Sequence, residues 1–256
     1  MKTLLLLLLP AVLGNNAVKW CRVNERILGG ERADKSEFPG LVYIRQNFWN
    51  GSLHLSYVCA GSVISEHWVL TGARCLYLSG SEEFRSLRVY PTKGSPHHIP
   101  CKDFIIHEEY DANEYLNDIA LIRLPVPMST IDPRSKITPI PEQDQNLTSN
   151  EVTLVGWGAT STTWMSPYLN KLEHVPLSQE LCLKVGVSPD KALCRYPTHA
   201  TGTACSFDDG GPIFMDGLQV GIVSEVPLFS SGLIPIDTRV SGYRDWIDEN
   251  IRSHTS

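Results

Sequence analysis

Residues 205–212 read CSFDDGGP, and this stretch decides which fold the rest of the chain is expected to adopt. Two aspartates stand directly before a Gly-Gly-Pro turn. A loop that carries a catalytic nucleophile would read in this way if its serine had been replaced by aspartate. The residues elsewhere in the chain determine whether such a loop still supports chemistry.

Short runs rich in β-branched residues recur between clusters of Gly, Pro, Ser and Asn, and helical periodicity is scarce before the C-terminus. These runs predict an antiparallel all-β architecture, either a sandwich or barrels. At the end of the chain Tyr243, Ile247 and Ile251 recur every four residues, which predicts an amphipathic helix. The β-rich runs include VCAGSVIS (58–65), IALIRL (119–124), EVTLVGWG (151–158) and LQVGIVSEV (218–226).

Composition limits the classes of partner. Of the 256 residues, 42% are hydrophobic, which is enough for one substantial core or two smaller cores packed together. Lys and Arg total 22 against 28 Asp and Glu, so the formal net charge is −6. This charge argues against nucleic acid, heparin or an anionic membrane as the main partner.

The N-terminus predicts export from the cell. It reads MKTLLLLLLPAVLG, with one lysine, a run of leucines and then small residues, which is typical of a secretory signal peptide over residues 1–17. No later segment is long and apolar enough to be transmembrane, so we expect a soluble, secreted protein. Seven cysteines in an exported chain favour disulfides over metal ligands, and no metal or cofactor is expected. The sequons at Asn50 and Asn146 are candidate glycosylation sites.

Five motifs in order resemble those of the trypsin/chymotrypsin-like serine proteases (peptidase S1), from Ile27 to the C-terminal helix. The resemblance implies two six-stranded antiparallel β-barrels, a cleft between them and a C-terminal α-helix. It implies a pro-segment at 18–26, an N-terminal barrel at 27–128, a connector at 129–145, and a C-terminal barrel with the helix at 146–256. The motifs are ERILGGERA (25–33), WVLTGARC (68–75), NDIALIRL (117–124), VGWG (155–158) and CSFDDGGP (205–212).

The resemblance implies that the catalytic triad has degenerated. It places Arg74 at the general-base position, Asp118 at the orienting position and Asp209 at the nucleophile position. Arginine stays protonated at physiological pH and cannot accept a proton. The charge of Asp209 would repel the oxyanion that forms during acyl transfer, and Phe207 replaces a glycine of the oxyanion hole. We therefore expect no proteolytic activity.

The two substitutions in the triad are electrostatically complementary. We hypothesise that the guanidinium of Arg74 lies between Asp118 and Asp209, since one guanidinium can serve two carboxylates and a buried carboxylate without a partner is costly. In the alternative arrangement, Arg74 points to solvent and Asp209 binds backbone amides.

By the same resemblance, the specificity pocket is expected to be filled. Branched and cyclic residues stand where the family has residues that leave a slot for a substrate side chain. The former pocket positions are Thr203, Ser224, Glu225, Val226 and Pro235.

The activation junction is expected after Arg26, where cleavage would free Ile27 for an ion pair with Asp208. In the alternative, the chain is never cleaved and Asp208 is only a turn residue.

The resemblance implies the disulfides Cys59–Cys75 and Cys182–Cys194. For Cys21 the most available partner is Cys101, and Cys205 lacks its usual partner.

Two loops, NFWNGS (47–52) and VPLFSSGL (226–233), are candidates for exposed binding surfaces. The alternative is that their apolar side chains Phe48, Trp49, Leu228 and Phe229 pack back onto the body.

The function expected from these features is that of a secreted, inactive serine-protease homologue. It would act as a monomer that binds a protein partner through surface loops and modulates a proteolytic or host-defence cascade such as complement. In this it resembles the inactivated serine-protease paralogues of parasitic mites. Two alternatives remain: an endopeptidase-like enzyme with weak or altered hydrolytic activity, and a decoy for protease inhibitors or substrates.

Overall fold

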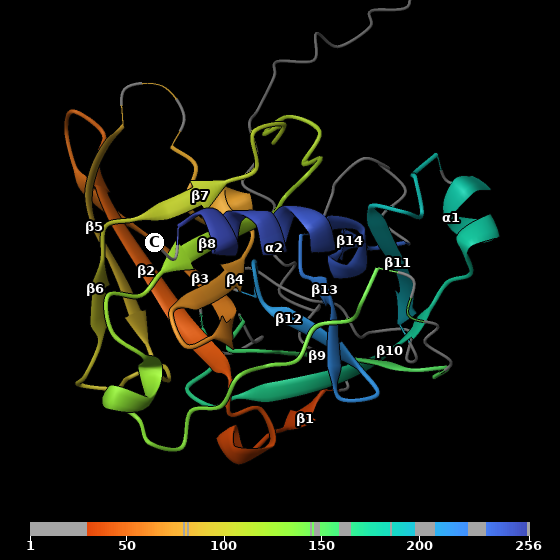
Figure 1. The fold of residues 1–256 in the computed structure, drawn as a ribbon, viewed down its shortest axis with the longest axis horizontal. Coiled ribbons are helices and arrows are strands. Elements are labelled where there is room, and N and C mark those ends of the chain that lie inside the picture. The colour runs from red at the N-terminus through yellow and green to blue at the C-terminus, as the bar shows by residue number, and fades with distance from the viewer. Residues whose placement is uncertain are drawn as a thin grey trace, which may run out of the picture.

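The computed structural model describes residues 30–78, 80, 82–143, 145, 149–158, 165–184, 186–197, 208–224 and 234–254. The chain forms two antiparallel β-barrels side by side and ends in a helix (Figure 1). The predicted all-β class and the predicted C-terminal helix are therefore confirmed.

The N-terminal sheet has the strand order β6-β5-β2-β3-β4-β8-β7. Strands β6 and β7 belong to one segment and are separated by only two residues, so the two ends of the sheet meet there and close a barrel of six strands. The strands are β2 (Leu41–Trp49), β3 (His54–Ser65), β4 (Trp68–Thr71), β5 (Glu83–Tyr90), β6 (Ile99–Cys101), β7 (Phe104–Ile106) and β8 (Ala120–Arg123).

The C-terminal sheet runs β10-β11-β14-β13-β12-β9, and β9 pairs again with β10 to close the second barrel of six strands. A short strand, β1 (Glu31–Arg32), adds to β10 from outside. The barrel strands are β9 (Val152–Gly156), β10 (Asn170–Pro176), β11 (Ala192–Pro197), β12 (Pro212–Met215), β13 (Leu218–Ile222) and β14 (Ile236–Arg239).

Helix α2 (Arg244–Ser253) ties the barrels together, while the shorter α1 (Gln179–Lys184) lies at the far side of the C-terminal barrel (Figure 1). The predicted apolar face of α2 is present: Ile247 is buried in a cluster that also contains Leu121 of β8 and Ile222 of β13. Burying these side chains removes apolar surface of both barrels from water, and this fixes the barrels against each other.

The hairpin of β2 and β3 carries one of the two loops considered as binding surfaces. Phe48 is only 1% exposed and its ring stacks on Tyr57 with centroids 4.7 Å apart, so this side chain packs back onto the body. Trp49 is half-buried and its ring lies 4.6 Å from that of His54. At the tip, the side-chain oxygen of Asn50 accepts hydrogen bonds from backbone N–H groups of residues 52 and 53. The second loop, with Leu228 and Phe229, lies outside the described residues.

Both expected disulfides, Cys59–Cys75 and Cys182–Cys194, are present. Cys101 is a buried free thiol in β6, so its suggested pairing with Cys21 is wrong. The residues of this strand alternate between buried and exposed, and Cys101 falls on the side that faces the barrel core. Cys21 and Cys205 lie outside the described residues.

Candidate functional site

Arg74 lies in a short 3₁₀ helix, Ala73–Cys75, that follows β4 at the junction of the two barrels. The disulfide from Cys75 to Cys59 joins this helix to β3. The side chain of Arg74 is therefore presented from a turn that is anchored on both sides to the N-terminal barrel.

Asp209 reaches the same place from the other barrel, on the turn before β12. Its carbonyl oxygen accepts a hydrogen bond from the backbone N–H of Ala60 in β3, at 2.9 Å. The following residue, Gly210, has φ +74°, and a Cβ there would lie 2.3 Å from the hydroxyl oxygen of Thr71. A residue with a side chain would be strained and would not fit, so glycine allows the turn to approach the N-terminal barrel.

The guanidinium of Arg74 faces Asp209. Arg74 Nη1 lies 3.0 Å from Asp209 Oδ1 and 2.7 Å from the carbonyl oxygen of Ser224, to which it donates a hydrogen bond. The ring of Tyr115 lies against the guanidinium, with its centroid 4.8 Å from Cζ. Both charged side chains are largely covered, at 26% exposed for Arg74 and 22% for Asp209.

Asp118 lies beneath this pair and is fully buried. Its carboxylate accepts hydrogen bonds from the backbone N–H of Arg74, at 2.8 Å, and from the hydroxyl of Ser224. Burial raises the pKa of Asp118 to about 6, although both hydrogen bonds and the nearby guanidinium favour the charged form. Thr238 also donates to the Asp118 carbonyl, which holds the residue from the side of β14.

The three residues of the hypothesised triad are thus close together, but their arrangement differs from the expected one. The described contacts place the guanidinium on Asp209, while the Asp118 carboxylate binds the main chain of Arg74. The alternative in which Arg74 points to solvent is wrong, because its guanidinium contacts Asp209 and the carbonyl oxygen of Ser224. No imidazole takes part in the contacts described for these three residues, and the guanidinium at their centre cannot accept a proton.

Asp208 has a separate environment. It is 4% exposed, and its Oδ1 accepts a hydrogen bond from the backbone N–H of Gly158, at 2.8 Å. A Cβ on Gly156 or Gly158 would lie 2.1 or 2.0 Å from the Asp208 carboxylate oxygens, so the two glycines of the VGWG motif make room for this side chain. Ile27, its expected ionic partner, lies outside the described residues.

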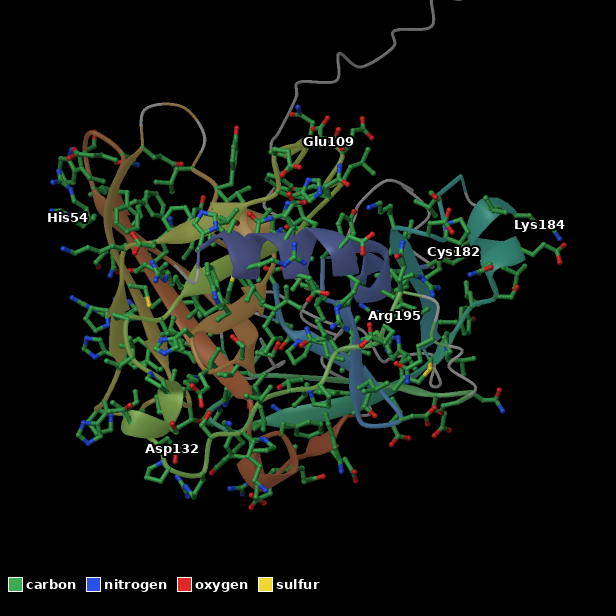
Figure 2. The ribbon with its side chains drawn as sticks, in the orientation of Figure 1. His54, Glu109, Asp132, Cys182, Lys184 and Arg195 are labelled. Atoms are coloured by element: carbon green, nitrogen blue, oxygen red, sulfur yellow. A yellow bond between two sulfur atoms is a disulfide. The ribbon has the colours of Figure 1, made fainter. Side chains whose placement is uncertain are left out.

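A buried ion pair lies next to two of the residues assigned to the specificity pocket. Arg195 Nε lies 2.5 Å from Asp237 Oδ2, and both side chains are 0% exposed (Figure 2). Asp237 also accepts a hydrogen bond from the backbone N–H of Ser224, and the backbone N–H of Arg195 donates to the carbonyl of Pro235. The charged side chains of Arg195 and Asp237 therefore lie next to Ser224 and Pro235, which are expected to form part of the pocket wall.

The same pair has a third polar neighbour, His174 of β10, whose Nδ1 lies 2.9 Å from Arg195 Nη1. Arg195, Asp237 and His174 were not identified from the sequence. The available signal was an arginine within the run ALCRYP and an aspartate directly after the apolar residues IPI (234–236). Only the pairing of β11 with β14, in which Cys194 lies opposite Ile236, brings the two charges together.

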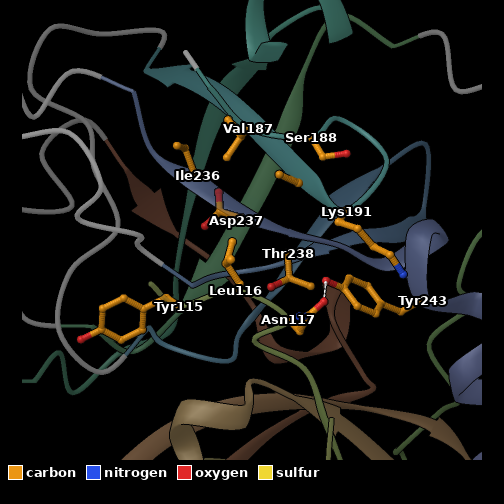
Figure 3. A pocket seen from close by; sticks show the side chains of 11 residues that line it. Tyr115, Leu116, Asn117, Val187, Ser188, Lys191, Ile236, Asp237, Thr238 and Tyr243 are labelled. Atoms are coloured by element: carbon orange, nitrogen blue, oxygen red, sulfur yellow. Dashed lines mark hydrogen bonds between the residues drawn. The ribbon is translucent and has the colours of Figure 1, made fainter. Parts of the chain in front are cut away.

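A cavity of about 210 Å³ opens behind Tyr115 (Figure 3). Tyr115 and Leu116 form one wall, and Lys191 reaches across the opposite side toward Tyr243, whose hydroxyl donates to Asn117 at 2.9 Å. Tyr115 and Asn117 have positive φ values, 53° and 54°, which are uncommon for residues with a side chain. This strained segment separates the cavity from Arg74.

Several expected site residues lie outside the described part of the chain, and the structure says nothing of their placement. Within the described residues, no group of three or more His, Cys, Asp or Glu side chains is arranged to hold a metal ion, and no helix is long and apolar enough to cross a membrane. The residues outside are Arg26, Ile27, Asn146, Thr203, Phe207, Glu225 and Val226.

Known proteins are similar to nearly the whole chain. A family model described as trypsin matches residues 27–247. A trypsin from Phaedon cochleariae is 31% identical over 240 residues, which covers 88% of this chain and 88% of that protein. Brachyurin from Leptuca pugilator is 33% identical over 198 residues and covers 75% and 86% of the two chains.

Solved structures share the fold. The structure of HL collagenase aligns with a TM-score of 0.73 at 23% identity, covering 87% of this chain and 97% of that one. At this identity the likeness concerns the fold alone.

Proposed function

Because this chain belongs to the trypsin family of serine proteases, we propose that it is a member that has lost proteolytic activity and acts by binding other proteins. The observation that carries the proposal is the ion pair between Arg74 and Asp209, which stand at the positions of the family's general base and nucleophile. A guanidinium cannot accept the proton of a nucleophile. A carboxylate held by a guanidinium is also a poor nucleophile toward a peptide bond.

The environment of the pair supports the same proposal. Peptide hydrolysis needs a proton acceptor beside the nucleophile, and Asp118, whose pKa burial raises to about 6, lies beneath Arg74 and away from solvent. Substrate side chains need an open pocket, and here the buried pair of Arg195 and Asp237 is hydrogen-bonded to the main chain of Ser224 and Pro235, two of the expected pocket residues. Phe207 adds a bulky side chain where the family has an oxyanion-hole glycine.

An activity-based test decides between this function and that of a weak hydrolase. The protein, treated with trypsin to open the Arg26–Ile27 bond, is incubated with a fluorophosphonate probe and separately with a broad peptide library. We expect neither labelling nor cleavage above a mock-purified control. Specific cleavage that disappears in the Asp209→Ala variant would instead establish a weak hydrolase.

Secretion is part of the proposal, and it is supported by the leucine-rich N-terminus and by the two disulfides. Activation-type cleavage is supported by the burial of the Asp208 carboxylate, at the position where the family's aspartate binds the new N-terminal ammonium. N-terminal sequencing of the protein from its natural source tests both ideas. A start at Ile27 agrees with cleavage, and a start at Val18 or earlier contradicts it.

We further propose that the bound partner belongs to a host-defence cascade such as complement. The support for this is the resemblance to inactivated protease paralogues of parasitic mites. Purified mature protein added to serum is expected to lower deposition of complement components on an activating surface in a dose-dependent way. Unchanged deposition through all activation routes would contradict this partner class and would leave the proposed loss of catalysis unaffected.

Size-exclusion chromatography with light scattering tests the expected monomer.

A further inference from the structure

Four tyrosines surround the ion pair on the side of the N-terminal barrel, and we call them the tyrosine rim: Tyr57, Tyr77, Tyr110 and Tyr115. The ring of Tyr77 lies 5.4 Å from that of Tyr110, and Tyr115 lies against the guanidinium of Arg74. Tyr57 and Tyr77 are 46% and 41% exposed. Tyrosine in such positions offers a large, rigid contact area with a polar end, which is why it is enriched in protein interfaces.

The four tyrosines come from different segments of the chain. Tyr57 is on β3, Tyr77 follows the 3₁₀ helix of Arg74, and Tyr110 and Tyr115 are on the loop before β8. Burial raises the pKa of the Tyr57 phenol, and Glu82, Arg74 and Tyr115 are close enough for their charges to act on it. Arg74 thus lies near both Tyr57 of β3 and Tyr115 of the loop before β8.

Acidic residues accompany the rim. Glu109 and Glu114 are exposed next to Tyr110 and Tyr115, and Figure 2 shows Glu109 on the outer side of this loop. The carboxylate of Asp111 accepts two backbone hydrogen bonds in the same loop, which hold its pKa below the ordinary value and keep it charged. Glu82 stands beside Tyr57.

Basic residues are sparse in this loop; Lys191 lies near it, with Nζ 4.1 Å from the centroid of the Tyr243 ring. The sequence has no Lys or Arg between Lys102 and Arg123, a stretch that contains six acidic residues. Arg74 at the centre of the rim is neutralised by Asp209, and Arg85 on β5 is paired with Glu83 at 2.9 Å. The rim is therefore aromatic and negatively charged.

We propose that the tyrosine rim and its acidic residues bind a protein partner through a segment rich in lysine and arginine. This inference rests on the proposed binding function and adds where the partner docks and which charge it carries. Cationic side chains are attracted both to carboxylates and to the faces of tyrosine rings. Nucleic acids and anionic membranes are negatively charged, as this surface is, and are therefore repelled by it.

The proposal is tested by fluorescence anisotropy with a rhodamine-labelled dodecapeptide of alternating arginine and glycine as the probe, at low ionic strength. The double variant Glu109→Gln with Glu114→Gln is expected to bind about tenfold more weakly than the unaltered protein, since it removes two partners of the cationic side chains. The matched control, Glu151→Gln with Asp216→Asn, removes the same charge from exposed sites in the C-terminal barrel and is expected to change the affinity less than twofold.

The aromatic contribution has its own pair of variants. Tyr77→Ala is expected to weaken binding about threefold, and Tyr196→Ala, which removes a tyrosine that is 51% exposed on β11, is expected to have no effect. Carbodiimide cross-linking of a lysine–glycine peptide locates the contacts independently, and we expect adducts at Glu82, Glu109 and Glu114.

Equal weakening by the two charge variants, or adducts spread over Glu151, Asp190 and Asp216, would show that the probe senses only the net charge and would overturn the proposal. Absence of any binding would overturn it as well. Neither result bears on the loss of catalysis, because the fluorophosphonate and peptide-library assays measure that separately.

Discussion

Arg74 and Asp209 form an ion pair with 3.0 Å between Nη1 and Oδ1, and each residue comes from a different barrel. On our proposed assignment, these are the positions of the general base and the nucleophile, and a guanidinium that cannot accept a proton replaces the base. The guanidinium is held further by the Ser224 carbonyl and by the ring of Tyr115. The pair is thus a charged contact between the two barrels.

The strength of this contact is measurable in a double-mutant cycle. Arg74→Ala, Asp209→Ala and the double variant are compared by urea unfolding. Because both side chains keep some exposure, we expect a coupling free energy of about 1 kcal/mol, at the upper end for surface pairs. A coupling free energy near zero would show that the pair does not stabilise the junction.

Restoring the triad residues is not expected to restore proteolysis. In the variant Arg74→His with Asp209→Ser, Phe207 still stands at an oxyanion-hole position, and Arg195 and Asp237 still lie against the pocket wall. Loss of one oxyanion donor alone lowers the rate about 10²–10³-fold. Peptidase activity present in this variant and absent in Arg74→His with Asp209→Ala would show that these obstructions are weaker than we infer.

Asp118 is expected to make the unfolding free energy depend on pH in an unusual direction. Its pKa rises from 3.8 to about 6 on folding, so between these values the folded protein binds the additional proton and stability falls as pH rises. Asp118→Asn should remove this contribution. The stability of the variant relative to the unaltered protein is therefore expected to rise by about 3 kcal/mol from pH 4 to pH 7, measured by urea unfolding.

The control for Asp118 is Asp111→Asn. Hydrogen bonds from the backbone of Asn113 and Glu114 hold the pKa of Asp111 below 3.8, so it titrates below this window. Its effect on stability should stay constant from pH 4.5 to pH 7. If Asp118→Asn behaved in the same way, its carboxyl would have an ordinary pKa.

The pair of Arg195 and Asp237 is expected to be costly to break and inexpensive to replace. Arg195→Met leaves a buried carboxylate without its guanidinium, which should lower the unfolding free energy by about 3–5 kcal/mol. Arg195→Met with Asp237→Leu should recover most of this loss. The same substitution at Arg134, whose side chain is 89% exposed beside Asp132, should cost less than about 1 kcal/mol. Guanidinium chloride unfolding of the three variants provides the comparison.

Cys101 is expected to resist alkylation in the folded protein. Burial raises the pKa of its thiol from 9.0 to about 12, which lowers the reactive thiolate fraction roughly a thousandfold. Peptide mapping after iodoacetamide treatment should show Cys101 unmodified in the native protein and fully modified in guanidinium chloride without reductant. Rapid modification of this peptide in the native protein would mean that the thiol is accessible.

Local sequence patterns predict the fold and the centre of the site well. The repeated short apolar runs indicate the strands, and opposite charges at two distant motifs indicate an ion pair between Arg74 and Asp209. The guanidinium lies close enough for its charge to act on Asp118, but the direct contact described between the two residues is made by the main chain of Arg74. The hydrogen bond from the backbone N–H of Arg74 depends on the turn geometry, which side-chain identity does not reveal.

Other features depend on long-range geometry. Arg195 and Asp237 are 42 residues apart and meet only because β11 pairs with β14. From the sequence alone, Cys101 could pair with any unpaired cysteine. In the structure, the alternation of side chains along β6 directs its thiol into the barrel. The positive φ of Tyr115 is not indicated by its residue type, whereas asparagine, as at position 117, is one of the residues that adopt this conformation more readily.

The buried pair of Arg195 and Asp237 also constrains how the chain can change. A single substitution that removes either partner leaves an isolated charge in the interior, so a one-step change toward an uncharged interior passes through a destabilised intermediate. Selection against unstable proteins would then retain the two charges together. The two positions are expected to change as a pair, independently of Arg74 and Asp209.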